Sequence, residues 1–172
     1  EQGYCYDDTY SNTLTYAGYF ISTTWYGYDS ATGEFKEKSA AQAAALQGSA
    51  DYTNTDVYID FNANLSLAAF TAKGNFLNWA TASKLDIEKK ILTGGKYDET
   101  NTRLVGESRG CLGRRFIKKV GVVASNNQQY FITLGIRPPE TSEKANAEDN
   151  TTRMEIYTVT STGFDNSACQ LA

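Results

Sequence analysis

The residues best able to do chemistry are sparse in this chain, and one type is missing. The 172 residues contain no histidine, which removes Ser-His-Asp and Cys-His nucleophiles, His-ligated zinc and haem, and His acid-base catalysis. The 20 acidic residues leave a glycan hydrolase built on two carboxylates as an alternative, although no spacing singles out a pair. We therefore expect a non-catalytic protein that needs no cofactor.

One short motif imitates a metal site. Oxygen-bearing side chains alternate along residues 60–66 as in a calcium loop, but the sixth position is Leu65 instead of glycine and the twelfth is Thr71 instead of glutamate. The solvent face of a strand explains the alternation better. We predict no metal site.

The cysteines favour disulfide chemistry over metal or redox chemistry. Cys5, Cys111 and Cys169 are far apart and lack the C-x-x-C spacing of zinc and redox sites. We expect one disulfide, with the remaining thiol pairing with another chain or with sequence outside this one. The pairing itself is open.

Aromatic residues near the N-terminus form the first candidate interaction site. Large aromatic rings stack on sugars and dominate the hot spots of protein interfaces. The alternative is that the same rings pack in a core or a lid. The candidates are Tyr16, Tyr19, Phe20, Trp25, Tyr26 and Tyr28.

A basic stretch forms the second candidate. Arg114, Arg115, Lys118 and Lys119 cluster within a chain whose net charge is −4. They either dock an acidic partner or form a solvated face with internal ion pairs. The acidic balance of the whole chain argues against a nucleic-acid or anionic membrane partner.

The elements that must position these residues are mainly strands. Twelve Tyr and eight Phe, with only two Pro, suit antiparallel sheets with one solvated face. A period-two strand is predicted over residues 57–67, a hairpin from 115–123 and 128–136, and a last strand over 154–160. A short helix is predicted within 36–48, capped by Ser39, and one long helix over 75–93, ended by Gly94.

Together these elements predict an α+β fold, an antiparallel sheet of about five or six strands with one long helix (75–93) packed on it and Tyr-rich loops outside. We expect a single domain, residues 1–172. It divides into a Tyr-rich segment with a short helix (1–56), a strand and the main helix (57–96), and a β-rich part (97–172) with a mobile loop at 141–152. No apolar run is long enough to span a membrane.

One block of the chain reads Gly74-Asn-Phe-Leu-Asn-Trp-Ala-Thr-Ala-Ser-Lys-Leu-Asp86-Ile-Glu-Lys-Lys-Ile-Leu-Thr-Gly94-Gly-Lys96. It resembles a signature of the large type IV pilus assembly and tip-adhesin proteins of Gram-negative bacteria. Upstream, Tyr16-Ala-Gly-Tyr19-Phe20 and Trp25-Tyr26-Gly-Tyr28 are similar to that family's Tyr-rich segment. The resemblance places the region in the N-terminal, von Willebrand factor A-like part of such proteins.

The resemblance implies a non-catalytic interaction protein at the cell surface, exported through the periplasm, in a pilus tip adhesin or a pilus-assembly factor. Its implied partners are pilus or filament subunits, with a host or surface ligand as a further option. The family's metal-site strand and calcium-binding propeller have no counterpart in this sequence, so metal-dependent adhesion is not implied.

The main alternative is a structural subunit of a self-assembling extracellular filament. In that arrangement the aromatic N-terminal segment inserts beside a neighbour's sheet edge, and Cys5 or Cys169 forms an inter-chain disulfide. The N-terminus lacks a signal peptide, so we expect an already processed or excised chain.

Overall fold

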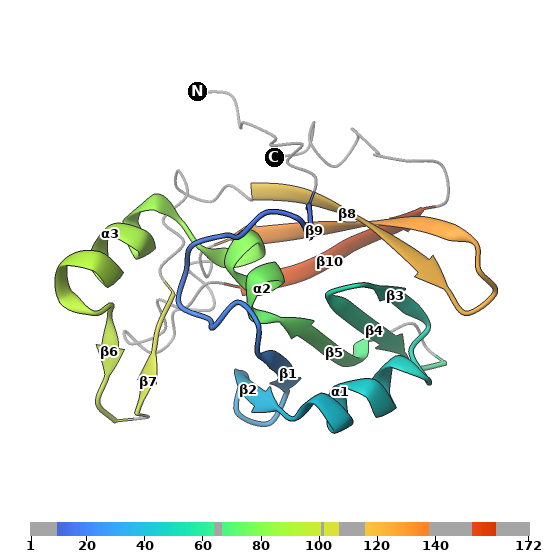
Figure 1. The fold of residues 1–172 in the computed structure, drawn as a ribbon, viewed down its shortest axis with the longest axis horizontal. Helices are drawn as coiled ribbons and strands as arrows, with labels where there is room; N and C mark the ends of the chain where they lie inside the picture. The colour runs from blue at the N-terminus through green and yellow to red at the C-terminus, as the bar shows by residue number, and fades with distance from the viewer. Residues whose placement is uncertain (1–9, 64–66, 101, 107–115, 138–152, 161–172) are drawn as a thin grey trace.

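An eight-stranded antiparallel sheet dominates the computed structural model, which describes residues 10–63, 67–100, 102–106, 116–137 and 153–160 (Figure 1). The strand order is β10-β9-β8-β3-β4-β5-β1-β2. The strands are β1 (Trp25–Asp29), β2 (Glu34–Lys38), β3 (Tyr52–Asn54), β4 (Val57–Phe61), β5 (Leu67–Lys73), β8 (Phe116–Ala124), β9 (Gln129–Arg137) and β10 (Arg153–Thr160). A separate hairpin joins β6 (Tyr97–Asp98) to β7 (Arg103–Leu104).

The α+β class and the antiparallel sheet are confirmed, but the expected five or six strands are too few. The additional strands come from the Tyr-rich segment. Its strands β1, β2 and β3 have only three to five residues each and show little alternation of apolar and polar residues. The single strand expected over 57–67 is also wrong. It is the hairpin of β4 and β5, with Ile59 opposite Phe70, so Leu67 is 41% exposed instead of buried.

The long helix expected over 75–93 is two helices, α2 (Gly74–Thr81) and α3 (Lys84–Thr93). The backbone is extended at Ala82 (ψ 125°) and at Ser83 (ψ 164°). Ser83 then starts α3 with a capping box. Its hydroxyl accepts the Asp86 N–H at 3.1 Å, while the buried Asp86 carboxylate accepts the Ser83 N–H at 3.0 Å. This local pair outcompetes continuation of α2.

Other helix limits agree with the sequence. Ser39 caps α1 (Ala40–Gln47), accepting the Gln42 N–H at 3.2 Å. Gly94 ends α3 in the left-handed conformation, φ +81°, which glycine adopts without a steric penalty. The predicted hairpin and the last strand are confirmed by β8, β9 and β10.

The two faces of the sheet bury different sets of side chains. Val57 and Ile59 of β4 join Phe76 and Trp79 of α2 in the main core. Tyr58 lies between them in sequence, so its side chain points to the other face, where it packs with Ala43 of α1, Ala50 and Trp25. Helix α2 therefore covers one face of the sheet and α1 part of the other.

We expect Ser83→Ala to destabilise the domain by about 1 kcal/mol. The Asp86 N–H loses its acceptor, and the Asp86 carboxylate loses the Ser83 hydroxyl, which donates to it at 2.7 Å, while it keeps the Ser83 backbone N–H. Urea denaturation measures the change in the free energy of unfolding. Ser39→Ala, in the more exposed capping box of α1, is the matched control and should cost less. Equal stability of Ser83→Ala and the parent chain would contradict the role assigned to this cap.

Candidate interaction site

Helix α2 carries two buried asparagines that hold an irregular segment of the chain against it. We call residues 10–24, which precede β1 and contain no strand, the strap. Asn75 and Asn78 lie three residues apart and so share one helix face, and they are 8% and 3% exposed. Their side-chain amides supply hydrogen bonds that an irregular backbone cannot make by itself.

Asn75 binds the first half of the strap. Its Oδ1 accepts the Tyr16 backbone N–H at 2.8 Å, and its Nδ2 donates to the Leu14 carbonyl at 2.8 Å and to the Tyr10 hydroxyl at 3.3 Å. An amide is needed here because it both donates and accepts.

Asn78 binds the second half. Its Oδ1 accepts the Phe20 N–H at 2.9 Å, and its Nδ2 donates to the carbonyls of Phe20 (3.0 Å) and Tyr16 (3.1 Å). A Cβ on Gly18 would collide with the Asn78 amide, so only glycine allows this approach. Lys90 of α3 donates to the Gly18 carbonyl.

A buried polar network anchors the start of the strap. The Tyr10 hydroxyl donates to Asp56 Oδ2 at 2.5 Å, and Lys73 Nζ lies 2.7 Å from Asp56 Oδ1. Burial, followed by the hydrogen bond to Asp56, raises the pKa of Tyr10 well above its ordinary value. The network joins the strap to the β3–β4 turn and to the end of β5.

The predicted aromatic candidates mostly line this contact. Tyr16 and Phe20 are half-buried against the main core, and Phe20 packs edge-on against Tyr26 at 5.0 Å between ring centroids. Tyr26 is buried, and its hydroxyl accepts the Ile21 N–H. Tyr19 is half-buried with its ring against Gly95. These rings pack the strap onto the core, which was the alternative considered from the sequence.

Two aromatic candidates lie elsewhere. Trp25 stacks on Tyr58 at 4.7 Å, with Lys73 Nζ 5.4 Å from the centre of its ring. Tyr28 is 43% exposed and tilts against Phe35. Of the six predicted rings, Tyr28 is the one whose surface is most open to a partner.

The predicted basic cluster is described only at Lys118. Its Nζ donates to the Trp79 carbonyl and lies 4.8 Å from the centre of the Trp79 ring, so this cation is part of the fold. The Trp79 indole N–H has no hydrogen-bond partner among the described residues. The other predicted features lie outside the described residues: Arg114, Arg115, the Lys119 side chain, the loop 141–152, and the cysteines Cys5, Cys111 and Cys169.

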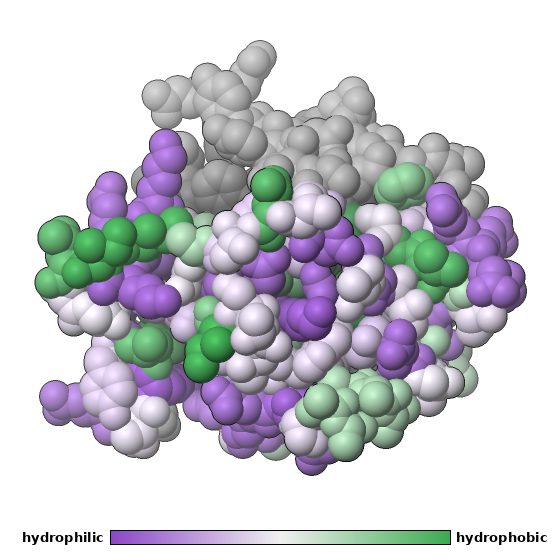
Figure 2. Space-filling view, in the orientation of Figure 1, coloured by the Kyte–Doolittle hydropathy of each residue, from purple (hydrophilic) through white to green (hydrophobic). Residues whose placement is uncertain are grey.

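An apolar surface that sequence reasoning missed is formed by residues of α3 and of the β6–β7 hairpin. Ile91 and Leu92 are 77% and 81% exposed, and Tyr97 and Leu104 of the β6–β7 hairpin are 53% and 45% exposed. We call these four residues the arm face. Figure 2 shows hydrophobic residues gathered over α3, and α3 and the hairpin project together from the sheet in Figure 1.

In the single helix expected over residues 75–93, Ile91 and Leu92 would share one broad apolar arc with Leu77, Ala80, Leu85 and Ile87, and we would expect that arc to be buried. That expectation is wrong because the break at Ala82 and Ser83 gives α3 a different direction from α2. The fully buried residue of α3 is Asp86. The available signal was Lys84 and Glu88, which interrupt the apolar arc and are exposed.

The hairpin is fixed to the sheet by an arginine. Arg103 of β7 donates to Glu34 of β2 at 2.9 Å and to Asp98 of β6 at 3.1 Å. Tyr97 and Leu104 are directly paired across the hairpin, so they present one small apolar surface.

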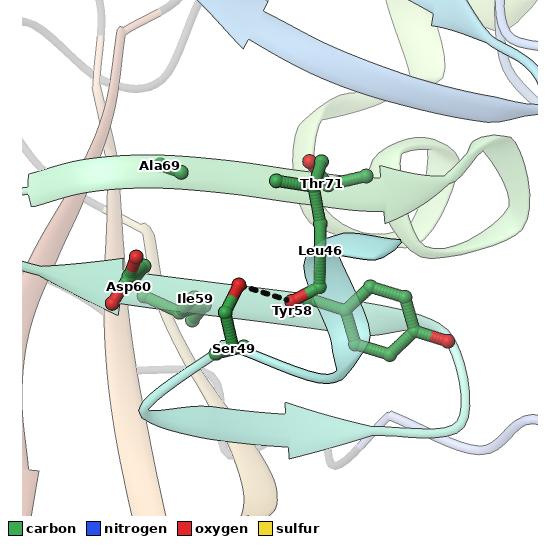
Figure 3. Close-up of a pocket in the computed structure, with 8 residues that line it drawn as sticks. Leu46, Ser49, Tyr58, Ile59, Asp60, Ala69 and Thr71 are labelled. Carbon is green, nitrogen blue, oxygen red and sulfur yellow. Dashed lines mark hydrogen bonds between the residues drawn. The ribbon is translucent and has the colours of Figure 1, made fainter. Parts of the chain in front are cut away.

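A hollow near α1 is too small for an organic ligand. Leu46, Ser49 and Ala50 line it on one side, and Tyr58, Ile59, Asp60, Ala69 and Thr71 on the other (Figure 3). The space that water can occupy is about 10 Å³, room for roughly one molecule. No group of three or more metal-ligating side chains occurs among the described residues.

One carboxyl pair lies beside this hollow. Burial raises the pKa of Asp60, and the hydrogen bond and charge of Asp51 raise it further. Asp51 also accepts the Phe61 N–H at 2.7 Å, which fixes its position. This is an acidic pair that sequence spacing did not single out.

The fold and the site define an α+β domain in which a short asparagine-bearing helix holds an aromatic strap. Residues 7–166 match the family described as PilY1 homolog, small alpha/beta domain, so the chain belongs to this type IV pilus-associated family. The match confirms the pilus family that residues 74–96 resemble. No curated protein and no solved structure matches the chain. None of the helices in the described part is long and apolar enough to cross a membrane.

We expect Asn78→Ala to destabilise the domain by about 2–4 kcal/mol, because three backbone groups of the strap lose their partner. Chemical denaturation measures the loss, and hydrogen exchange at the Phe20 amide should accelerate with it. Asn12→Ala, on an exposed strap residue, is the control and should change stability by less than about 0.5 kcal/mol. Equal effects of the two substitutions would show that Asn78 does not hold the strap.

Acidification should stabilise the fold through Asp60. Its pKa is raised in the folded state, so its contribution is present below the unfolded-state pKa and is lost as pH rises through the folded-state pKa. Lys36 lowers the pKa of Asp29, so Asp29 contributes stability that is lost on acidification. This contribution is the same in the parent chain and in the Asp60→Asn variant. Asp60→Asn should therefore be more stable than the parent chain at neutral pH, and it should lack the stabilisation that Asp60 provides at acid pH. Urea unfolding from pH 7 to acid measures both, and parallel curves for variant and parent would refute the assignment.

Proposed function

We propose that the chain is a non-catalytic interaction module of a type IV pilus tip adhesin or pilus-assembly factor, acting outside the cell after export through the periplasm. The observation that carries the proposal is the family match over residues 7–166. Its partners are pilus subunits, with a host or surface ligand as a further partner. In a longer relative, the module lies within the N-terminal, von Willebrand factor A-like part.

The arm face is the surface we assign to these contacts. Exposed side chains as large as Ile91 and Leu92, and the exposed pair Tyr97 and Leu104 of the hairpin that follows α3, are typical of protein-binding surfaces. The Arg103 ion pairs to Glu34 and Asp98 hold the hairpin in place. A partner would therefore meet a largely preformed surface, which lowers the entropic cost of binding.

The non-catalytic part of the proposal is supported by the size of the hollow beside Asp60. Carboxylate-based glycan hydrolysis requires a cleft that holds a sugar between two acids, and this hollow has room for roughly one water molecule. Turnover of a glycan by the purified chain, abolished by Asp60→Asn or Asp51→Asn, would overturn it.

A structural subunit of an extracellular filament is the second candidate, and the strap favours it. An aromatic segment that contains no strand and is held by side chains is suited to exchange between chains. Fibres formed by the purified chain in the absence of pilus proteins would favour this candidate over the adhesin or assembly role.

The pilus role predicts that charge on the arm face reduces pilus association. We expect Ile91→Lys combined with Leu92→Lys to lower the amount of protein recovered with sheared pili at least about tenfold, because lysine at an apolar contact is costly to desolvate. Stability should be unchanged, since both residues are exposed. Leu67→Lys, an exposed leucine on β5, is the matched control. Unchanged recovery of the double variant would remove the arm face from the contact.

A further inference from the structure

Helix α2 holds the strap much as a peptide-binding site holds a bound peptide. The side chains of Asn75 and Asn78 make six hydrogen bonds to the strap, and five of them go to backbone atoms. Asn78 binds both the N–H and the carbonyl of Phe20, as a neighbouring strand would. Contacts of this kind fix an extended segment whichever copy of the chain supplies it.

The strap also carries a pattern that only a matching segment can provide. Tyr10 fills the core position where its hydroxyl reaches Asp56. Gly18 is required because a Cβ would strike the Asn78 amide. Tyr16 and Phe20 pack against the buried core. Spacing and ring positions together select this sequence over other aromatic peptides.

The strap contains no strand and takes no part in the ladders of the described sheet. The ladders of β1 begin at Trp25, after the strap ends. Backbone bonds join the strap to α2 at its end, from Gly74 N–H to Thr24 O at 2.8 Å and from Asn75 N–H to Ser22 O at 3.1 Å. Exchange of the strap would therefore break these bonds and the contacts of the two asparagines, but no pairing between two strands.

We propose that the strap of one copy binds α2 of a second copy, so that the chain assembles by strap exchange. Every contact made within one chain is available between two, and the intramolecular form wins at low concentration because of its high effective concentration. Crowding of copies shifts the balance toward exchange. The proposal concerns self-association and holds or fails independently of the pilus role.

Two full-length variants test the exchange by complementation. The first, Asn75→Ala with Asn78→Ala, keeps an intact strap but loses the two side-chain amides that bind it, which we call the clamp. The second, Gly18→Val with Phe20→Ala, keeps the clamp but loses a strap that fits it. Each alone should be monomeric, whereas their mixture should form a 1:1 heterodimer, detected by native mass spectrometry with one variant ¹⁵N-labelled. Only monomers in a mixture of two variants that both unfold cooperatively would overturn the proposal.

A labelled peptide keeps the proposal testable if either variant fails to fold. A fluorescent peptide of residues 10–24, titrated to about millimolar concentration so that it competes with the chain's own strap, should bind the unmodified full chain saturably. Gly18→Val in the peptide should weaken binding at least about tenfold, and Thr15→Ala, at an exposed position, should not. Absence of binding, or equal binding of a scrambled peptide, would show that α2 does not accept a second copy's strap.

Discussion

The hydrogen bonds between the α2 amides and the strap backbone are the interaction on which the rest of the structure depends. The strap contains no strand, so its N–H and C=O groups need partners wherever it excludes water. Asn75 and Asn78 supply them at the point where the strap covers Phe76 and Trp79. Without the amides, an irregular segment over this apolar helix would leave polar groups buried and unsatisfied.

This constraint explains the residue types in the block that begins at Gly74. A Cβ on Gly74 would meet the Ile21 carbonyl, so glycine lets the strap cross the start of the helix. Aspartate in place of Asn78 would provide no donor for the Tyr16 and Phe20 carbonyls. Phe76 and Trp79, on the same short helix, bury their rings in the sheet. One turn of helix thus holds the core on one side and the strap on the other.

Sequence periodicity and capping signals predicted the fold where the deciding interactions are local. Ser39, Gly94 and the β8–β9 hairpin follow from caps, turns and alternation within a few residues. The break before α3 was also local, a Ser-x-x-Asp box at Ser83, but the longer apolar arc obscured it. The clamp could not be predicted in this way, because Asn78 and Phe20 are 58 residues apart and nothing in the local pattern distinguishes a clamping asparagine from a solvated one.

Helix α3 connects the strap to the arm face, because it binds the strap and carries two of the four arm-face residues. Lys90 donates to the Gly18 carbonyl, and the Tyr19 ring packs against Gly95, directly after α3. Ile91 and Leu92 face solvent on the same helix. The strap therefore helps to set the orientation of α3, and through α3 that of the exposed leucine and isoleucine.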